Sequence, residues 1–358
     1  MVGINERIYI LGIIGYGGMA GNHNKQLSQG NVRVRLKGVF DIDESRMQVA
    51  KEQGHIAYES KEALLADPEI DIVLVATTND SHKNLAIEAL RAGKHVICEK
   101  PVTMSSEELV EIMEVAKECG KVFTVDQNRR FNRDFINVWR TIDSGIIGKP
   151  YVIESRVEGS RGMPEGWRTT KALGGGMMYD WGVHLIDQIM YMVKEKVKTV
   201  FCNMYYVNYD EVEDNFRLVM VFESGLTAQV EISTNNFITH PRFYVLCTEG
   251  TMVVTDWDGT GTVVKKLCDD NKWDTEIAKV KAGPTKTMAP RNPETVETIQ
   301  LTEPKDVRDN LDPVYEQLVD AIEGAELLIK PEETLRVMKV MEAAFESAAT
   351  GKSVEVNI

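Results

Sequence analysis

An acid, an imidazole and a second acid follow a run of three glycines near the middle of the chain. Asp180, His184 and Asp187 stand four and three residues apart, so a helix would place their side chains on one face. Residues of these types transfer protons near neutral pH. A metal site is the alternative, since metal ligands also occur four residues apart on helices. Because no cysteine or further histidine stands nearby, we expect acid–base chemistry and no metal.

The preceding glycines, Gly174–Gly176, predict that the backbone passes close to another group. Glycine has no side chain to collide with a neighbour, so the run suits either a tight turn or contact with a bulky molecule. We expect substrate to approach there. We expect Asp187, in contrast, to cap a helix or form a salt bridge rather than act in catalysis.

A second glycine-rich turn near the N-terminus has the spacing of a dinucleotide-binding site. Gly15, Gly17 and Ala20 fit the pattern G-x-G-x-x-G/A, and Gly18 and Met19 complete the turn. The turn follows an apolar, strand-like run and opens a helical pattern, which is the context in which the backbone binds a pyrophosphate. A glycine-rich surface turn is the alternative.

Polar residues at the ends of later strands complete the predicted cofactor site. Asp41 ends the second strand, where an acid binds ribose hydroxyls and repels a 2′-phosphate, so NAD is favoured over NADP. Asp43 is a second candidate, although we expect it to cap the next helix. Thr77 and Asn79 follow a buried strand and are expected to contact the cofactor, with a capped loop as the alternative.

The pattern of apolar residues divides the chain into two parts. Over residues 1–125, short apolar runs alternate with helical patterns, which predicts a doubly wound parallel sheet, a Rossmann fold that binds NAD. Over 126–358, consecutive strand-like runs predict an α+β domain with a large, open, mostly antiparallel sheet for substrate binding and oligomerisation. The last helical turns are expected to pack back on the first domain. Residues 281–313 show no clear period and are expected to form a long loop.

Composition excludes several classes of protein. The chain has 358 residues and a net charge of −14, which argues against nucleic acid or an anionic membrane as a partner. Its five cysteines are scattered, so no disulfide framework is expected. No apolar run is long enough to span a membrane. We therefore expect a cytoplasmic protein that binds a small molecule.

Four motifs together resemble the Gfo/Idh/MocA family, which includes glucose–fructose oxidoreductase and inositol dehydrogenase. They are the glycine turn, Glu99-Lys100-Pro101 after a later strand, the run 128–131 (Asn-Arg-Arg-Phe), and the motif of three glycines, aspartate and histidine at 174–187. They occur in the family's order and cover nearly the whole chain. One departure is a threonine, Thr78, where the family commonly has proline, which loosens the turn but retains Asn79.

The resemblance implies that Lys100, Asp180 and His184 surround the reacting carbinol, and that Glu99 and Lys100 adjoin the cofactor. Oxidising an alcohol with NAD requires a base for the hydroxyl proton. We expect His184 to be that base. Lys100 would stabilise the developing alkoxide, or would itself take the proton. Asp180 would orient His184, tune it or bind a neighbouring hydroxyl.

Residues near these motifs suit a sugar ring. Trp167 and Arg168 would supply a stacking face and forked hydrogen bonds, and Arg130 is a further candidate. Either arginine has a structural ion pair as its alternative. Tyr179 is expected either to reach the substrate or to pack in the core.

The predicted function is an NAD-dependent dehydrogenase or reductase for a secondary alcohol of a sugar, glycoside or cyclitol. One alternative keeps NAD tightly bound and recycles it, in oxidation–elimination or in sugar-to-sugar redox. A second is a non-catalytic sensor of NAD or sugar. The resemblance also implies a homo-oligomer, a dimer or tetramer, in which open sheets pack face to face. The surface residues expected there are Tyr205, Tyr206, Val219, Val221, Val230 and Ile232.

Overall fold

The computed structural model of the chain describes residues 7–30, 32–269, 278–280, 283–285 and 291–358. The first part forms a six-stranded parallel sheet in the order β3-β2-β1-β4-β5-β6. The strands are β1 (Tyr9–Ile14), β2 (Val34–Phe40), β3 (Ile56–Ala57), β4 (Ile72–Val75), β5 (His95–Cys98) and β6 (Phe123–Val125). The order reverses between β1 and β4, and a doubly wound sheet binds its dinucleotide at this switch point.

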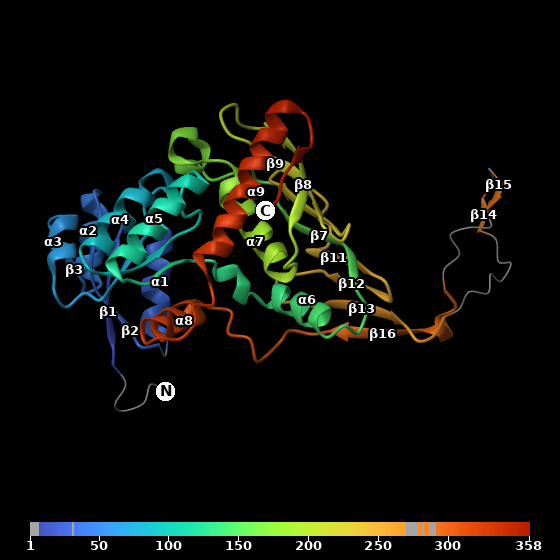
Figure 1. Ribbon diagram of the computed structural model, residues 1–358, viewed down its shortest axis with the longest axis horizontal. Coiled ribbons are helices and arrows are strands. Elements are labelled where there is room, and N and C mark those ends of the chain that lie inside the picture. The colour runs from blue at the N-terminus through green and yellow to red at the C-terminus, as the bar shows by residue number, and fades with distance from the viewer. Residues whose placement is uncertain (1–6, 31, 270–277, 281–282, 286–290) are drawn as a thin grey trace.

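Helices connect these strands and cover the sheet (Figure 1). They are α1 (Gly18–Gln29), α2 (Glu44–Glu52), α3 (Lys61–Ala66), α4 (His82–Arg91) and α5 (Ser106–Cys119). β4 is buried along its whole length because it is covered on both faces. α5 begins after Ser105, whose hydroxyl accepts the Glu108 N–H, and ends at Gly120 in the left-handed conformation.

The second part forms a nine-stranded sheet in the order β16-β13-β12-β11-β7-β10-β9-β8-β17. Neighbouring strands run antiparallel, except for the parallel pair β7 and β10. The bounds are β7 (Pro150–Glu158), β8 (Val197–Tyr205), β9 (Asn215–Phe222), β10 (Thr227–Ser233), β11 (Phe243–Cys247), β12 (Gly250–Val254), β13 (Gly261–Lys266), β16 (Val296–Leu301) and β17 (Val354–Glu355). A separate pair joins β14 (Ala278–Val280) to β15 (Gly283–Thr285).

Four further α-helices and six short helical turns complete the described part of the chain. The α-helices are α6 (Arg133–Asp143), α7 (Val183–Met192), α8 (Asp312–Ile322) and α9 (Pro331–Thr350). The short turns are η1 (Asn79–Ser81), η2 (Asn128–Phe131), η3 (Trp167–Thr169), η4 (Lys171–Leu173), η5 (Met178–Gly182) and η6 (Pro293–Thr295). α9 contacts α5 and β6 on one side and α7 and β8 on the other, so it lies between the two sheets (Figure 1).

Helix α8 packs against the first sheet although it follows most of the second sheet in sequence. Val314, Tyr315 and Leu318 of α8 share a buried apolar cluster with Leu11 and Ile13 of β1. The chain therefore crosses from the first sheet to the second and returns, and Figure 1 shows α8 beside β1, β2 and α1. Burial of several large apolar side chains, each worth roughly 1.5–3 kcal/mol, holds this return segment in place.

One expectation for the second domain is wrong. Residues 296–301 lie inside the predicted long loop but form β16, an edge strand paired with β13. Val296 is half-buried and the next two residues are exposed, while Ile299 and Leu301 pack against the core, so only one face of the strand carries an apolar signal. Residues 281–282 and 286–290 of that segment lie outside the described residues.

Among the helices of the described residues, none is long and apolar enough to cross a membrane.

Candidate active site

The glycine turn between β1 and α1 has room for a phosphate group. Gly15 has a φ of +89°, and a side chain there would collide with the backbone of Ala76. A Cβ at Gly18, in contrast, would meet no atom within 4 Å, and one at Gly17 only the end of the Arg46 side chain. Gly17 caps α1 without a side-chain bond to the helix amides. Open space beside unpaired amides suits an anion, so the turn fits a dinucleotide pyrophosphate.

The remaining residues of this turn lie where the motif predicts. Gly18 and Met19 form the first residues of α1, and Ala20 is fully buried against the apolar cluster that includes β1. A larger residue in place of Ala20 would push the helix away from the strand.

Asp41 lies at the end of β2 beside this turn. Its carboxylate accepts hydrogen bonds from the backbone N–H of Tyr16 at 2.5 Å and of Asp43 at 2.8 Å. Arg46 is half-exposed and donates to Asp41 at 3.2 Å. Because a carboxylate has about four acceptor positions, Asp41 retains capacity for ribose hydroxyls. Asp43 caps α2 as expected.

In the turn after β4, the side chains of Thr77 and Asn79 form hydrogen bonds with other protein groups. The Thr77 hydroxyl lies 2.6 Å from that of Ser81. Asn79 is buried, and its amide nitrogen donates to the carbonyl oxygen of Gly174 at 2.8 Å. This bond joins the first domain to the glycine run of the second, which favours a structural role for Asn79 over the predicted cofactor contact.

Each glycine of the run 174–176 is needed because protein atoms lie against it. A Cβ at Gly174 would come within 2.8 Å of Asn79, and one at Gly175 within 2.6 Å of the carbonyl oxygen of Arg168. A Cβ at Gly176, where φ is +106°, would lie 2.5 Å from a carboxylate oxygen of Glu213. Three protein segments therefore occupy the space beside this run, where we had expected substrate to approach. A substrate contact at the run is not supported.

Glu213 is a site residue that the sequence did not reveal. Its side chain accepts the N–H of Met178 at 2.8 Å and its carbonyl accepts that of Met177 at 3.0 Å, so it caps the start of the segment that carries Asp180 and His184. The residue is buried, and burial raises the pKa of Glu213 to about 7 despite the backbone hydrogen bonds. In sequence it stands in the polar run Glu213-Asp214-Asn215, which is typical of an exposed turn.

The segment that carries Asp180, His184 and Asp187 begins with a π-helical turn, η5, which leads into α7. π-turns are rare and occur frequently at functional sites. Asp180 lies in this turn, and His184 and Asp187 lie in α7. The three side chains do not bind one another but find separate surroundings.

Lys100 and Asp180 form the ion pair that joins the two domains at the site. Lys100 follows β5, and its ammonium donates to the Asp180 carbonyl at 2.9 Å and to its carboxylate at 3.0 Å. Arg168 donates to the other carboxylate oxygen at 2.8 Å. Burial alone would raise the pKa of Asp180, but the charges and hydrogen bonds of Lys100 and Arg168 outweigh it and lower that pKa. Asp180 is therefore a carboxylate held between two cations.

His184 is buried beside this ion pair. Burial lowers the pKa of His184 well below 6.5, and the charges of Lys100 and Arg129 lower it further. Its ring is neutral at physiological pH, and its Nδ1 atom is buried without a hydrogen-bond partner among the described residues. A buried polar atom without a partner is costly, so this atom is available for a substrate hydroxyl. The predicted orientation of His184 by Asp180 is not observed, since the Asp180 carboxylate binds Lys100 and Arg168.

Arg130 and Asp187 form a buried structural pair. The Arg130 guanidinium makes a two-pronged ion pair with Asp187, at 2.7 and 2.6 Å, and a third bond to Glu333 of α9 at 2.6 Å. These bonds use all sides of the guanidinium, so the predicted substrate contact by Arg130 is not supported. Asp187 forms the salt bridge that was expected of it.

Glu99 also faces protein instead of the cofactor. Its carboxylate lies 2.9 Å from Nε2 of His23, a buried residue whose other ring nitrogen lies 2.7 Å from the Tyr315 hydroxyl of α8. Asp126 lies 3.3 Å from the same Nε2. Burial would lower the pKa of His23, but Asp126 and Glu99 raise it to about 9.

This cluster contains atoms of the kind that bind metals. Ligand atoms of His23, Glu99 and Asp126 lie within 4.8 Å of one another. The raised pKa of His23 makes it an imidazolium, which takes the place of a cation between the two carboxylates. We therefore interpret the cluster as a hydrogen-bonded network that anchors the backbone before Lys100. The predicted cofactor contact by Glu99 is replaced by this positioning role.

Two aromatic candidates differ in their surroundings. Trp167 is half-buried, and the Arg168 guanidinium stacks over its ring at 4.4 Å. Tyr179 packs against Phe345 of α9, with ring centres 5.3 Å apart, and donates its hydroxyl to the Met104 carbonyl. Trp167 and Arg168 therefore border the Lys100–Asp180 pair. Tyr179 packs in the core, which is the second of the two roles predicted for it.

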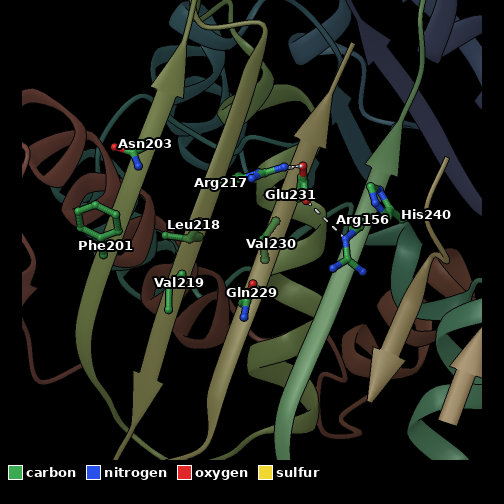
Figure 2. A pocket seen from close by; sticks show the side chains of 10 residues that line it. All are labelled: Arg156, Phe201, Asn203, Arg217, Leu218, Val219, Gln229, Val230, Glu231 and His240. Carbon is green, nitrogen blue, oxygen red and sulfur yellow. Dashed lines mark hydrogen bonds and ion pairs between the residues drawn. The ribbon is translucent and has the colours of Figure 1, made fainter. Parts of the chain in front are cut away.

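A hollow of about 390 Å³ lies away from this chemistry, on the face of the second sheet opposite α7 and α9 (Figure 2). Phe201, Arg217 and Val219 line it, and Arg217 pairs with Glu231 at 2.7 Å. The alternation along β9 and β10 corrects part of the predicted oligomer surface. Val230 and Ile232 are almost fully buried on the helix-covered face. The remaining predicted residues, Tyr205, Tyr206, Val219 and Val221, are exposed or half-buried.

Two family models match the chain. Residues 10–127 match the oxidoreductase family with an NAD-binding Rossmann fold known as Gfo/Idh/MocA, and residues 135–253 match a C-terminal domain of the same family.

Individual relatives agree with these matches. An uncharacterized oxidoreductase of Schizosaccharomyces pombe is 31% identical over 84% of this chain and 85% of its own. A myo-inositol 2-dehydrogenase of Thermotoga maritima is 28% identical over 62% of this chain and 68% of its own. The crystal structure of an NAD-binding protein from Listeria innocua is 44% identical, covers 98% of this chain and 100% of its own, and superposes with a TM-score of 0.92.

Proposed function

Because the chain belongs to the Gfo/Idh/MocA family of NAD-binding oxidoreductases, we propose that it oxidises a secondary alcohol of a sugar, glycoside or cyclitol, or reduces the corresponding ketone. The nicotinamide of NAD supplies the hydride acceptor or donor when it is bound. A relative named as an inositol dehydrogenase supports a polyhydroxylated substrate.

The residues that would hold the cofactor surround the switch point of the first sheet. The amides at Gly17 and Gly18 would bind the pyrophosphate, and Asp41 the adenosine ribose. The buried carboxylate of Asp41 favours NAD over NADP, because a 2′-phosphate would meet its negative charge. Lys100 follows β5 in the same sheet and would lie toward the nicotinamide end.

The proton chemistry rests on Lys100 and His184. The His184 ring is neutral, and its Nδ1 atom has no partner among the described residues, so this imidazole would accept the hydroxyl proton. The ammonium of Lys100 would hydrogen-bond the same oxygen and stabilise the negative charge that develops on it. Lys100 remains the second candidate for the proton acceptor. Asp180 holds Lys100 and Arg168 in place and is a hydrogen-bond acceptor for a neighbouring substrate hydroxyl.

The observation that carries this proposal is the juxtaposition of a buried ion pair and an unpartnered imidazole where the two domains meet. A structural salt bridge has no need of a neutral histidine with an unused buried nitrogen. Donors placed where an alkoxide develops, with an acceptor for its proton, are the groups that alcohol oxidation requires. Trp167 and Arg168 border them and would contact the sugar ring.

The test is NADH formation with a panel of sugars, sugar acids and cyclitols. Lys100→Ala and His184→Ala should each lower kcat/KM by roughly 100-fold or more, as expected for groups that move or stabilise a proton. Lys339→Ala, which alters an exposed residue of α9, is the control. Full activity in both site variants would contradict the assignment. Bound NAD that turns over without net NADH would favour the recycling alternative.

A further inference from the structure

Beside His184 lies a group of aromatic and cationic side chains that the proposed reaction does not use. The Arg129 guanidinium lies over the rings of Trp181 and Trp257, at 5.0 and 5.7 Å from their centres. The two rings lie 5.6 Å apart, and the Trp181 ring meets the His184 ring edge to face at 5.8 Å. Trp181, Trp257 and Arg129 therefore lie beside the His184 ring, which would accept the substrate proton.

Arg129 differs from the other cations around it because none of the described carboxylates forms an ion pair with it. Arg242, which stacks on the Trp257 ring at 3.8 Å, is paired with the buried carboxylate of Asp134 at 2.7 Å. Within the described part of the chain, no carboxylate comes within ion-pair distance of Arg129. Asp309 is near enough for its charge to be felt by Arg129, but it is exposed and makes no ion pair with it.

The charges around the reacting position therefore do not balance. Lys100, Arg168 and Arg129 are three cations, and among the described residues Asp180 is the one carboxylate that pairs with any of them. The chain as a whole carries a net charge of −14, so this local positive excess runs against its composition. A site of this kind attracts an anion. The attraction between opposite charges is stronger there than in bulk water, because the site is partly desolvated.

We propose that Arg129, packed against the rings of Trp181 and Trp257, binds a carboxylate carried by the substrate. This rests on the proposed function and narrows its substrate to an acid form of a sugar or cyclitol. A guanidinium stacked on aromatic rings keeps its N–H edge free, and that edge matches a carboxylate with two parallel hydrogen bonds. The exposed part of the Trp257 ring would cover a C–H face of the same ring.

The experiment compares acids with their neutral counterparts on the full-length protein with NAD. The pairs are D-glucuronate with D-glucose, D-galacturonate with D-galactose, and D-gluconate with D-glucitol. We expect an acid to be the better substrate. Arg129→Gln should raise KM for that acid roughly tenfold to a hundredfold, the effect of losing a hydrogen bond to a charged group, with little change for its neutral counterpart. Arg91→Gln makes the same change of charge on an exposed residue of α4 and should have no effect.

Tryptophan fluorescence gives a readout that does not depend on turnover. An acid that binds Arg129 beside Trp181 and Trp257 should change the emission saturably in the wild type and in Arg91→Gln but not in Arg129→Gln, and Trp257→Phe should diminish the change. Equal use of acids and neutral sugars, or an acid preference that Arg129→Gln leaves unchanged, would overturn the proposal.

The two proposals fail in different ways. Turnover of neutral sugars alone would leave the oxidoreductase function standing and remove the carboxylate site. Saturable, Arg129-dependent binding of an acid without any NADH would support the carboxylate site and contradict the proposed function. Absence of both turnover and the fluorescence response would count against both.

Discussion

At the scale of single residues, the site is built from charges placed around one neutral imidazole. Lys100 and Arg168 keep Asp180 ionised, and Lys100 together with Arg129 and burial keeps His184 neutral. The aspartate is therefore ionised and the histidine neutral before any substrate binds. The chemistry assigned to each follows from these neighbours rather than from its type alone.

The low pKa of His184 gives a pH profile that identifies the proton acceptor. A histidine with its usual pKa of 6.5 would lose its function as a base near that pH, whereas His184 should stay neutral below it. We expect kcat/KM to remain level from about pH 8 to below about pH 6.5 and to fall only in more acidic solution. A kcat/KM that instead rises with pH at or above about 7.5, with a rise that is absent in Lys100→Arg, would assign the proton to Lys100.

Glu213 should act on catalysis through the backbone that it caps. Glu213→Ala removes the acceptor of the Met178 N–H and should destabilise the fold by about 1–2 kcal/mol, the usual cost of a lost helix cap, and lower kcat by displacing Asp180 and His184. Glu213→Gln retains an acceptor oxygen and should keep most of both. Unfolding curves and kcat for the two variants make the comparison. Equal loss in both would mean that the negative charge, and not the hydrogen bond, is what the site requires.

At the scale of elements, segments that are distant in sequence meet at the two short glycine-rich stretches. The first lets α1 begin beside the carboxyl ends of β1 and β4. The second, at 174–176, lets the turn at 167–168, the turn after β4 and Glu213 converge on the start of η5. Helix α8 contacts α1, the helix after the first stretch, through the hydrogen bond between Tyr315 and His23.

The His23 network should make stability depend on pH. The pKa of His23 is about 9 in the folded protein and roughly 6.5 in an unfolded chain. Protonation of His23 therefore stabilises the folded state by up to about 3 kcal/mol. This stabilisation is fully present below about pH 6.5 and is lost as the pH rises through about 9. Tm should therefore fall over this range in the wild type, and fall less in His23→Gln. Parallel curves for the two proteins would show that His23 is not protonated in the fold.

At the scale of the whole molecule, the two sheets have different exposure. The first is covered by helices on both faces, and the second by α7 and α9 on one face only. Its other face carries the hollow lined by Phe201 and Arg217 (Figure 2). A broad sheet face with half-buried apolar residues and ion pairs suits contact with a second copy of the chain.

Assembly through this face is testable by light scattering. We expect the wild type to have the mass of a dimer or tetramer, and Phe201→Asp to reduce that mass by placing an unpaired charge in the contact. Lys339→Asp, at an exposed position of α9, is the control for a change of charge elsewhere. A monomeric wild type would remove the expectation, and an unchanged mass in Phe201→Asp would place the contact on another surface.

Much of this protein was predictable from the sequence because the signals are local. The strand, glycine turn and helix at 9–29, the alternation of strands and helices that follows, and the motif residues Lys100, Asp180 and His184 can all be recognised in short windows. Backbone periodicity and the steric needs of a turn depend on neighbours in sequence, so they can be read there.

The tertiary structure decided which side chains meet. It placed Glu213 against Gly176, turned Glu99 and Arg130 into buried ion pairs, and packed Arg129 against two tryptophans with no ion pair to any described carboxylate. It also added β16 to the edge of a sheet from a stretch that predicts a loop. Burial and charge pairing depend on contacts between distant segments, and these contacts exist only once the chain has folded. The same lysine or glutamate can be catalytic, structural or exposed until those neighbours are known.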